Sequence, residues 1–355
     1  MKLDSKEVGR VFLAPLSGVA DSPFRRVCRG FGAEVVYSEM VSAIGLAKAN
    51  WRSRAILKFY EDERPIGVQI FGRDAAYMGV AARLAGEARP DLIDINFSCP
   101  ASKIVSRGAG AALLREPELM GPIARAVVAG AGLPVTAKIR LGWDHASINA
   151  VEVGRMLEDT GIAALAVHGR TWEQGFRDRA SWEEVARVKQ AVRIPVVLSG
   201  DVRTASDAER AFAETGCDAL MVGRGSFGRP WVFAAIREGL GGGSYAEPGF
   251  EEVSSVLLRH LDLGIEEFGE HVAVRRFRKH LLWYTKGLRG VVNLRREMGV
   301  TSTRDDVVAL LARLRDQAHD WGGGGGSGAG RPEGDAAEVI ESHLEIQGWP
   351  EGELG

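Results

Sequence analysis

A chain of 355 residues with 45% hydrophobic residues is long enough to bury one large core, and its net charge of -2 excludes no class of partner. No apolar run approaches the roughly 18 residues that a membrane-spanning helix needs, and residues 1–7 lack a signal peptide's apolar centre. We therefore expect a cytoplasmic protein with no membrane partner. Cys28, Cys99 and Cys217 are too few and too scattered for a disulfide scaffold or a paired-cysteine metal site, and Cys28 and Cys217 have the apolar neighbours of core residues.

Eight short apolar runs alternate with helix-like segments along the first two thirds of the chain. The runs occupy residues 11–14, 34–38, 66–70, 92–96, 135–139, 164–168, 195–198 and 219–222. The helical patterns occupy residues 75–88, 116–129, 150–160, 181–191 and 205–215, and several end near Gly132, Gly161 or Gly216, where a left-handed residue would stop a helix. Eight such units predict a closed (β/α)8 barrel of parallel strands, although an open doubly wound sheet shares the same local pattern.

Polar and glycine residues follow the apolar runs, and a barrel would bring them together at one mouth. In chain order they are Pro15, Leu16, Ser17 and Gly18; Ser38 and Glu39; Gln69; Asn96 and Cys99; Lys138 and Arg140; His168, Gly169 and Arg170; Ser199, Gly200 and Asp201; Gly223, Arg224 and Gly225. An open sheet would instead spread them along an edge. The glycines after the last two runs favour a phosphate site, because loops there expose backbone N–H groups.

Several of these side chains also have a purely structural interpretation. Lys138 lies between Ala137 and Ile139, so on a barrel strand it would point into the mouth and hold a negative charge; a solvated strand end is the alternative. His168 is as consistent with a hydrogen-bonded core histidine as with a ligand contact. The Gln69 amide could pair with a neighbouring backbone or bind the edge of a planar heterocycle.

Cys99 is the candidate reactive group. It follows the buried run 92–96 by three residues, precedes Pro100 and lies shortly before the glycine-rich segment 106–110. A thiol in this position can donate a proton or act as a nucleophile, whereas a buried structural cysteine is the common alternative. The glycine-rich segment predicts a mobile loop able to fold over the thiol. No metal partner of suitable spacing is nearby, so we predict no metal site.

The second part of the chain contains a local basic segment. Between His271 and Val300 a single acid, Glu297, accompanies eight basic residues: Arg275, Arg276, Arg278, Lys279, Lys286, Arg289, Arg295 and Arg296. A solvated helix surface is one interpretation. The neighbouring Trp283 and Tyr284 favour the other, a surface that binds phosphates.

Together these motifs resemble the tRNA-dihydrouridine synthases. The resemblance covers about residues 11–314 and rests on residues 14–25, Asp94-Ile95-Asn96 with Cys99-Pro100, Ala137-Lys138-Ile139-Arg140, His168-Gly169-Arg170-Thr171, Gly200-Asp201 and Gly223-Arg224. Gly228-Arg229-Pro230-Trp231 and Arg278-Lys279-His280 resemble the bacterial B-type branch. The sequence departs from the family pattern at Ser98, where glycine is usual, at Leu16-Ser17, where Met-Ala is common, and at Ser199, where asparagine is usual.

The resemblance implies a flavin-bearing barrel followed by a small helical domain that helps to hold tRNA. We predict the barrel over residues 1–240 and the helical domain over 250–316. A flexible acidic tail over 321–355, with a glycine-rich linker at 322–328, lies outside the resemblance. The implied reaction reduces uridine to 5,6-dihydrouridine in the D-loop of tRNA. FMN, reduced by NADPH or NADH, passes hydride to C6 while Cys99 protonates C5.

The resemblance also assigns residues to the cofactor and the substrate, and it implies a monomer. Those assigned to FMN are Pro15, Leu16, Ser17, Gly18, Gln69, Lys138, His168, Ser199, Gly200, Asp201, Gly223 and Arg224. Those assigned to tRNA are Asn96, Lys103, Arg107, Arg140, Arg170, Arg275, Arg278 and Lys279.

Two other functions stay open. An FMN-dependent oxidoreductase of free pyrimidines, such as a dihydroorotate dehydrogenase, would share the barrel and the flavin but would have no use for the basic segment. A tRNA-binding module without activity is the other, and the presence of Cys99, Lys138 and His168 argues against it.

Overall fold

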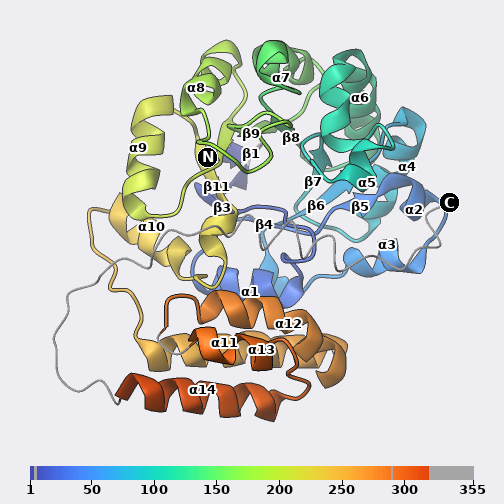
Figure 1. The fold of residues 1–355 in the computed structure, drawn as a ribbon. Helices are drawn as coiled ribbons and strands as arrows, with labels where there is room; N and C mark the ends of the chain where they lie inside the picture. Colours follow the sequence, from blue (N-terminus) through green and yellow to red (C-terminus); the bar gives the residue numbers. More distant parts are fainter. Residues whose placement is uncertain (4–5, 289–290, 320–355) are drawn as a thin grey trace.

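Eight parallel strands form a closed barrel in the computed structural model, which describes residues 1–3, 6–288 and 291–319 (Figure 1). The barrel strands are β3 (Val11–Leu13), β4 (Val36–Tyr37), β6 (Ile66–Phe71), β7 (Leu92–Asn96), β8 (Val135–Arg140), β9 (Ala164–His168), β10 (Val196–Ser199) and β11 (Ala219–Val222). A parallel bridge between Phe12 and Val35 joins β3 to the start of β4, and the Leu13 N–H donates to the Val35 carbonyl at 2.9 Å. This bridge closes the ring, so the predicted barrel is confirmed and the open sheet was the wrong alternative.

Helices cover the outside of the barrel (Figure 1). They are α1 (Ser22–Gly30), α4 (Ala75–Glu87), α6 (Met120–Ala131), α7 (Ala150–Glu158), α8 (Trp182–Ala191), α9 (Ala205–Thr215) and α10 (Val232–Leu240). Four of the five predicted helices are confirmed to within two residues. The helix predicted over residues 116–129 instead begins at Met120, because Pro117 opens a 3-10 turn (Pro117–Leu119) first. Gly132 and Gly216 adopt the predicted left-handed conformation after α6 and α9, with φ of 60° and 63°.

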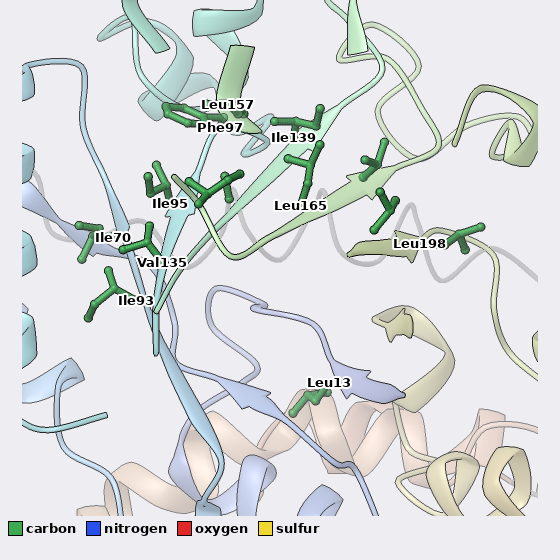
Figure 2. Packing of buried hydrophobic residues seen from close by; sticks show 14 of the residues in the cluster. Leu13, Ile70, Ile93, Ile95, Phe97, Val135, Ile139, Leu157, Leu165 and Leu198 are labelled. Carbon is green, nitrogen blue, oxygen red and sulfur yellow. The ribbon is translucent and has the colours of Figure 1, made fainter. Parts of the chain in front are cut away.

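Strand side chains alternate between the outer helices and the barrel interior. Ile93 and Ile95 of β7 pack outward with the helix-facing core (Figure 2). Because the side-chain period of a strand is two, Asp94 and Asn96, which alternate with these isoleucines, point into the barrel. The same alternation on β8 places Lys138 inside, where it is paired in register with Asn96. The polar residues of the site are therefore inward-facing members of ordinary buried strands.

The helical connection between β4 and β6, which we call the rim insertion, was not predicted from the sequence. It consists of the short strand β5 (Val41–Ser42), the helices α2 (Ala43–Ala47) and α3 (Trp51–Ile56) and a 3-10 turn (Glu61–Glu63). β5 pairs in parallel with the last two residues of β6, so the helices after it extend from the mouth side of the sheet. Helices of five and six residues are too short to show a helical period, which is why the sequence did not reveal them.

Four helices after the barrel pack around a second apolar core (Figure 1). They are α11 (Phe250–Phe268), α12 (Glu270–Tyr284), α13 (Val291–Met298) and α14 (Arg304–His319). Within the described ranges, no helix has the length and apolar character needed to cross a membrane. The tail predicted over 321–355, its linker at 322–328 and Arg289 lie outside the described residues. The predicted boundaries at 240 and 250 stay a prediction.

Candidate active site

Cys99 lies at the barrel mouth, on the loop after β7, and Asn96 holds that loop in place. The Asn96 Oδ1 atom accepts hydrogen bonds from the backbone N–H groups of Ser98 and Cys99, each at 2.9 Å. Burial raises the pKa of the Cys99 thiol above its ordinary value, although the Ala101 backbone N–H and nearby cations act in the opposite direction. The half-buried side chain is therefore a protonated thiol at neutral pH.

The glycine-rich segment 106–110 packs directly beside this loop. Gly110 has a φ of 60°, and a Cβ atom there would lie 2.9 Å from the Cys99 carbonyl oxygen. Any larger residue would therefore push the two loops apart. Lys103 and Arg107 are exposed on the same stretch, close to the thiol in the chain. The predicted mobility of the segment stays a prediction.

A buried chain of hydrogen bonds inside the barrel orients the Asn96 side chain. Thr136 Oγ1 donates to Asp94 Oδ1 at 2.5 Å, and Gln69 Nε2 donates to Asp94 Oδ2 at 2.6 Å. Asn96 Nδ2 then donates to Gln69 Oε1 at 2.8 Å. Since an ionised carboxylate only accepts, Asp94 fixes the orientation of the Gln69 amide, and Gln69 in turn directs Asn96 Oδ1 toward the Cys99 loop.

The role of Asp94 was missed from the sequence. Burial raises its pKa to about 6, against the hydrogen bonds from Thr136 and Gln69 and the charge of Lys138, so the group is mainly ionised above that pH. The sequence does contain one signal, because a charge inside the apolar run 92–96 has to face the barrel interior.

Two cations of β8 differ in how fully the protein uses their donors. Burial lowers the pKa of Lys138 to about 8, with Arg140 acting in the same direction, and its Nζ lies 3.5 Å from Ser98 Oγ. Arg140 donates to the Ser98 carbonyl at 3.0 Å and to the Thr171 and Gly175 carbonyls at 2.8 and 2.9 Å. Arg140 therefore ties the loops after β7 and β9 together, whereas Lys138 keeps donors for a ligand.

His168 at the end of β9 presents an unused acceptor. Its Nδ1 lies 3.1 Å from the Ser199 carbonyl oxygen, and its buried Nε2 has no partner among the described residues. Burial and the neighbouring cations hold the pKa of His168 well below 6.5, so the ring is neutral. Because the carbonyl oxygen can only accept, the proton belongs on Nδ1, and Nε2 is left to accept from a ligand.

The tips of β9, β10 and β11 share one carboxylate. Both oxygens of Asp201 lie 2.8 Å from Arg170 Nη2, and Arg224 approaches the same carboxylate to 3.5 Å. Burial raises the Asp201 pKa, but the Ala180 N–H and the two guanidinium groups outweigh it and leave that pKa below its ordinary value. Two cations around one anion leave a net positive charge, which suits a bound phosphate. Gly200, with a φ of 118°, gives the chain the turn that places Asp201 there.

The tip of β3 is held by groups from two distant segments. Glu39 accepts from the Gly18 N–H at 2.5 Å, and Lys279 of α12 donates to the Gly18 carbonyl. Burial lowers the pKa of Lys279. At the tip of β11, a Cβ atom on Gly223 would lie 3.7 Å from Leu16, so this glycine faces the space between the first and last tips.

The structure separates the residues that we expected to contact tRNA. Arg275 is exposed on α12, whereas Arg278 donates to the Thr301 carbonyl at 3.0 and 2.7 Å, inside the helical region. Arg140, Arg170 and Lys279 likewise have partners within the chain. Pro15 and Leu16 are half-buried at the mouth, Ser17 and Gly18 are exposed there, and Ser199 is buried.

The fold and the site define a (β/α)8-barrel enzyme with a protonated thiol and several buried cations at its mouth. The family model for dihydrouridine synthase (Dus) matches residues 12–319. The tRNA-dihydrouridine synthase B of Pseudomonas aeruginosa is 40% identical over 317 residues, which cover 89% of this chain and 95% of that protein. A probable tRNA-dihydrouridine synthase of Rhizobium leguminosarum bv. phaseoli is 39% identical over 309 residues, 86% of this chain and 95% of that protein. The chain belongs to the dihydrouridine synthase family and is an oxidoreductase that modifies tRNA.

Solved structures resemble this chain in fold alone. Histamine dehydrogenase from Rhizobium sp. 4-9 is 13% identical with a TM-score of 0.52, over 74% of this chain and 50% of that one. A 2-naphthoyl-CoA reductase is also 13% identical, with a TM-score of 0.51, over 67% of this chain and 51% of that one. The similarity of fold supports the barrel architecture. Sequence identity this low carries no information on the substrate.

Proposed function

We propose that this protein reduces uridine to 5,6-dihydrouridine in the D-loop of tRNA, with FMN as bound cofactor and NADPH or NADH as reductant. The observation that carries the proposal is the meeting of Cys99, Lys138 and the unused His168 Nε2 at one barrel mouth, in a chain of this family. The relatives named tRNA-dihydrouridine synthase B support tRNA as the substrate.

The donors and acceptors at the mouth fit a flavin nucleotide. A neutral acceptor at His168, a cation at Lys138 and a net positive charge around Asp201 match a ring with polar edges and a phosphate. The residues that would hold it are Pro15, Leu16, Ser17, Gly18, Gln69, Lys138, His168, Ser199, Gly200, Asp201, Gly223 and Arg224. Reduced FMN supplies a hydride for C6 of the uracil ring.

Lys138 has to be charged to act on a bound anion. With a pKa of about 8 it is mainly protonated at neutral pH, and its contact with Ser98 leaves other ammonium protons for a ligand. The hydroxyl of Ser98, a residue that departs from the family pattern, therefore holds the Lys138 ammonium group beside the thiol loop. A glycine there would offer no hydroxyl acceptor.

Cys99 is the proposed proton donor. As hydride adds to C6, the C5=C6 π bond breaks, and C5 takes the proton from Sγ, which leaves a thiolate that solvent reprotonates. Lys138 and Arg140 both lower the pKa of Cys99, so they stabilise the thiolate as it forms. Asn96 holds the loop so that the thiol keeps its place in the mouth.

The target uridine has to leave the tRNA stack to reach this mouth, which requires a hold on the RNA backbone. Exposed Arg275 on α12 supplies part of it, and Lys103 and Arg107 lie near the thiol. Arg140, Arg170, Arg278 and Lys279 act on the substrate indirectly, because they hold the loops and the helical region in place.

One experiment distinguishes the three candidate functions. Purified protein is mixed with NADPH and with unmodified tRNA, free uracil, orotate or no acceptor, and both NADPH oxidation and dihydrouridine content are measured. We expect tRNA-dependent oxidation that matches the dihydrouridine formed. Oxidation that responds to free uracil or orotate would instead indicate a pyrimidine oxidoreductase, and tRNA binding without reduction would indicate an inactive binding module.

A further inference from the structure

The rim insertion between β4 and β6 carries an exposed indole. Trp51 opens α3 and leaves 70% of its surface exposed. Its helix is held by other residues: Asn50 Oδ1 accepts from the Arg52 N–H at 2.9 Å, and buried Ser53 packs closely on Gly45 of α2. The Trp51 side chain is thus not needed to keep α3 in place and is available for a partner.

The part of the insertion that contains α2 and α3 is basic, whereas the three acids of its 3-10 turn (Glu61–Glu63) are each paired with an arginine. From Met40 to Tyr60 the chain contains no acid and four cations, Lys48, Arg52, Arg54 and Lys58. Among the described residues, no carboxylate lies within 4.0 Å of Lys48, Arg52 or Arg54, whereas Lys58 pairs with Glu267 at 2.9 Å. Arg52 lies 5.3 Å from the centre of the Trp51 ring. Lys48 and Arg54 are exposed and Arg52 is half-buried, so an exposed indole lies in a basic segment that can attract phosphates and stack on bases.

This rim surface adjoins both the reactive mouth and α12. Met40, just before β5, lies 3.5 Å from the Asn96 amide nitrogen. On the other side, Lys58 and Tyr60 contact Glu267 at the end of α11, and the next residue, Phe268, has Arg276 of α12 at 4.5 Å from its ring centre. The insertion therefore bridges from the thiol side of the mouth to the basic helical region.

We propose that the α2–α3 rim is a second tRNA-binding surface, in which Trp51 stacks on an unpaired base and Lys48, Arg52 and Arg54 bind the flanking phosphates. The proposal rests on the proposed function and specifies how that substrate is held. It commits to RNA because an acid-free segment with an exposed indole matches a polyanion with accessible base faces. A base held at the rim would keep the tRNA against the mouth while the target uridine is turned out.

The test compares aromatic variants at the rim. We expect Trp51→Ala to raise the dissociation constant for unmodified tRNA about tenfold, within the range found for single stacking contacts, and Trp51→Phe to keep most of the affinity. Tyr77→Ala, which removes a half-exposed ring from α4, is the matched control and should bind like wild type. Flavin content and melting temperature show whether each variant is folded.

A second pair of variants tests the charges. Lys48→Glu with Arg54→Glu should weaken tRNA binding and flatten its dependence on salt by about one to two in the logarithmic slope. Arg125→Glu with Arg210→Glu, exposed positions on α6 and α9, is the control for net charge. Rim variants that bind tRNA like their controls would overturn the proposal. A wild-type protein that binds tRNA but reduces no uridine would overturn the proposed function alone, since the rim comparison would still be decided by binding.

Discussion

The barrel mouth and the outer surfaces of α3 and α12 both gather cations, but they treat them in opposite ways. At the mouth, Lys138 and Arg140 are buried, and desolvation lowers the pKa of both. On the outside, Arg54 and Arg275 are exposed to solvent. Burial makes a charge sensitive to a single bound group, whereas exposure lets it act on any nearby phosphate. One chain thus keeps the cations of the reactive site apart from the cations that face the RNA backbone.

The largest effect should come from removing the thiol at the mouth. Cys99→Ala should lower dihydrouridine formation on unmodified tRNA by about 10²–10⁴-fold, the usual contribution of a general acid. Flavin content and tRNA affinity should be unchanged, since those depend on other residues. Cys217→Ala, which removes a buried thiol far along the chain, is the control. Near wild-type turnover in Cys99→Ala would show that the proton comes from elsewhere.

The next effect is the pH dependence that burial gives to the mouth. Lys138 is protonated below its pKa of about 8 and neutral above it, so flavin affinity should fall above pH 8, by at most about tenfold per pH unit for one proton. Titration of flavin binding from pH 6 to 9.5 measures this. Lys138→Met should bind flavin weakly, with no fall in affinity above pH 8. Lys138→Arg should move that fall to a higher pH. The same fall in Lys138→Met would assign it to another group.

Charge reversal on the outer surface of α12 should weaken tRNA binding, with less dependence on pH than flavin binding shows. Arg275→Glu should weaken tRNA binding about tenfold and reduce its salt dependence, while flavin content and melting temperature stay the same. Arg278→Glu should also weaken binding, but it should lower the melting temperature too, because it breaks two hydrogen bonds to the Thr301 carbonyl. Equal melting temperatures for the two variants would mean that Arg278 is as free as Arg275.

Replacing Asp94 should have a smaller effect on turnover than any of these changes. Asp94 has a folded pKa of about 6, above its ordinary 3.8, so its ionised form opposes folding once the pH exceeds this window. The two-unit shift corresponds to about 3 kcal/mol, and Asp94→Asn removes that cost while losing one hydrogen bond worth about 1 kcal/mol. The variant should be no less stable than wild type at pH 7.5, with turnover reduced about fivefold because Gln69 can rotate.

Thermal unfolding at pH 4 and pH 7.5, together with turnover on tRNA, checks this prediction. Relative to wild type, the variant should gain stability as the pH rises. Full turnover in Asp94→Asn would show that Asp94 does not set the orientation of the amides above it.

Much of the fold follows from the sequence. The barrel strands have strong local signals, and the run 92–96 coincides with β7. Lys138 was expected to face the mouth from its neighbours Ala137 and Ile139, and its Nζ lies 3.5 Å from Ser98 Oγ on the loop after β7. By contrast, α2 and α3 left no signal, because elements this short contain less than two helical turns and depend on packing against the barrel.

The partners of the site residues could not be predicted. The sequence shows that Arg140 is a cation, but its carbonyl acceptors belong to two loops, each more than thirty residues away. Lys279 is the extreme case, since its acceptor, Gly18, lies near the other end of the chain. Long-range hydrogen bonds of this kind depend on the closed barrel and on how α12 docks, neither of which is encoded in a local pattern.

The contact between Lys279 and Gly18 fixes the position of the helical region relative to the barrel mouth. A single residue, Gly18, is held by Glu39 of the loop after β4 through its N–H and by Lys279 of α12 through its carbonyl. The helical region is thereby fastened at the very edge of the opening, and the separation between its exposed arginines and the thiol becomes a set length. A tRNA that contacts those arginines would therefore be held at one position relative to the thiol.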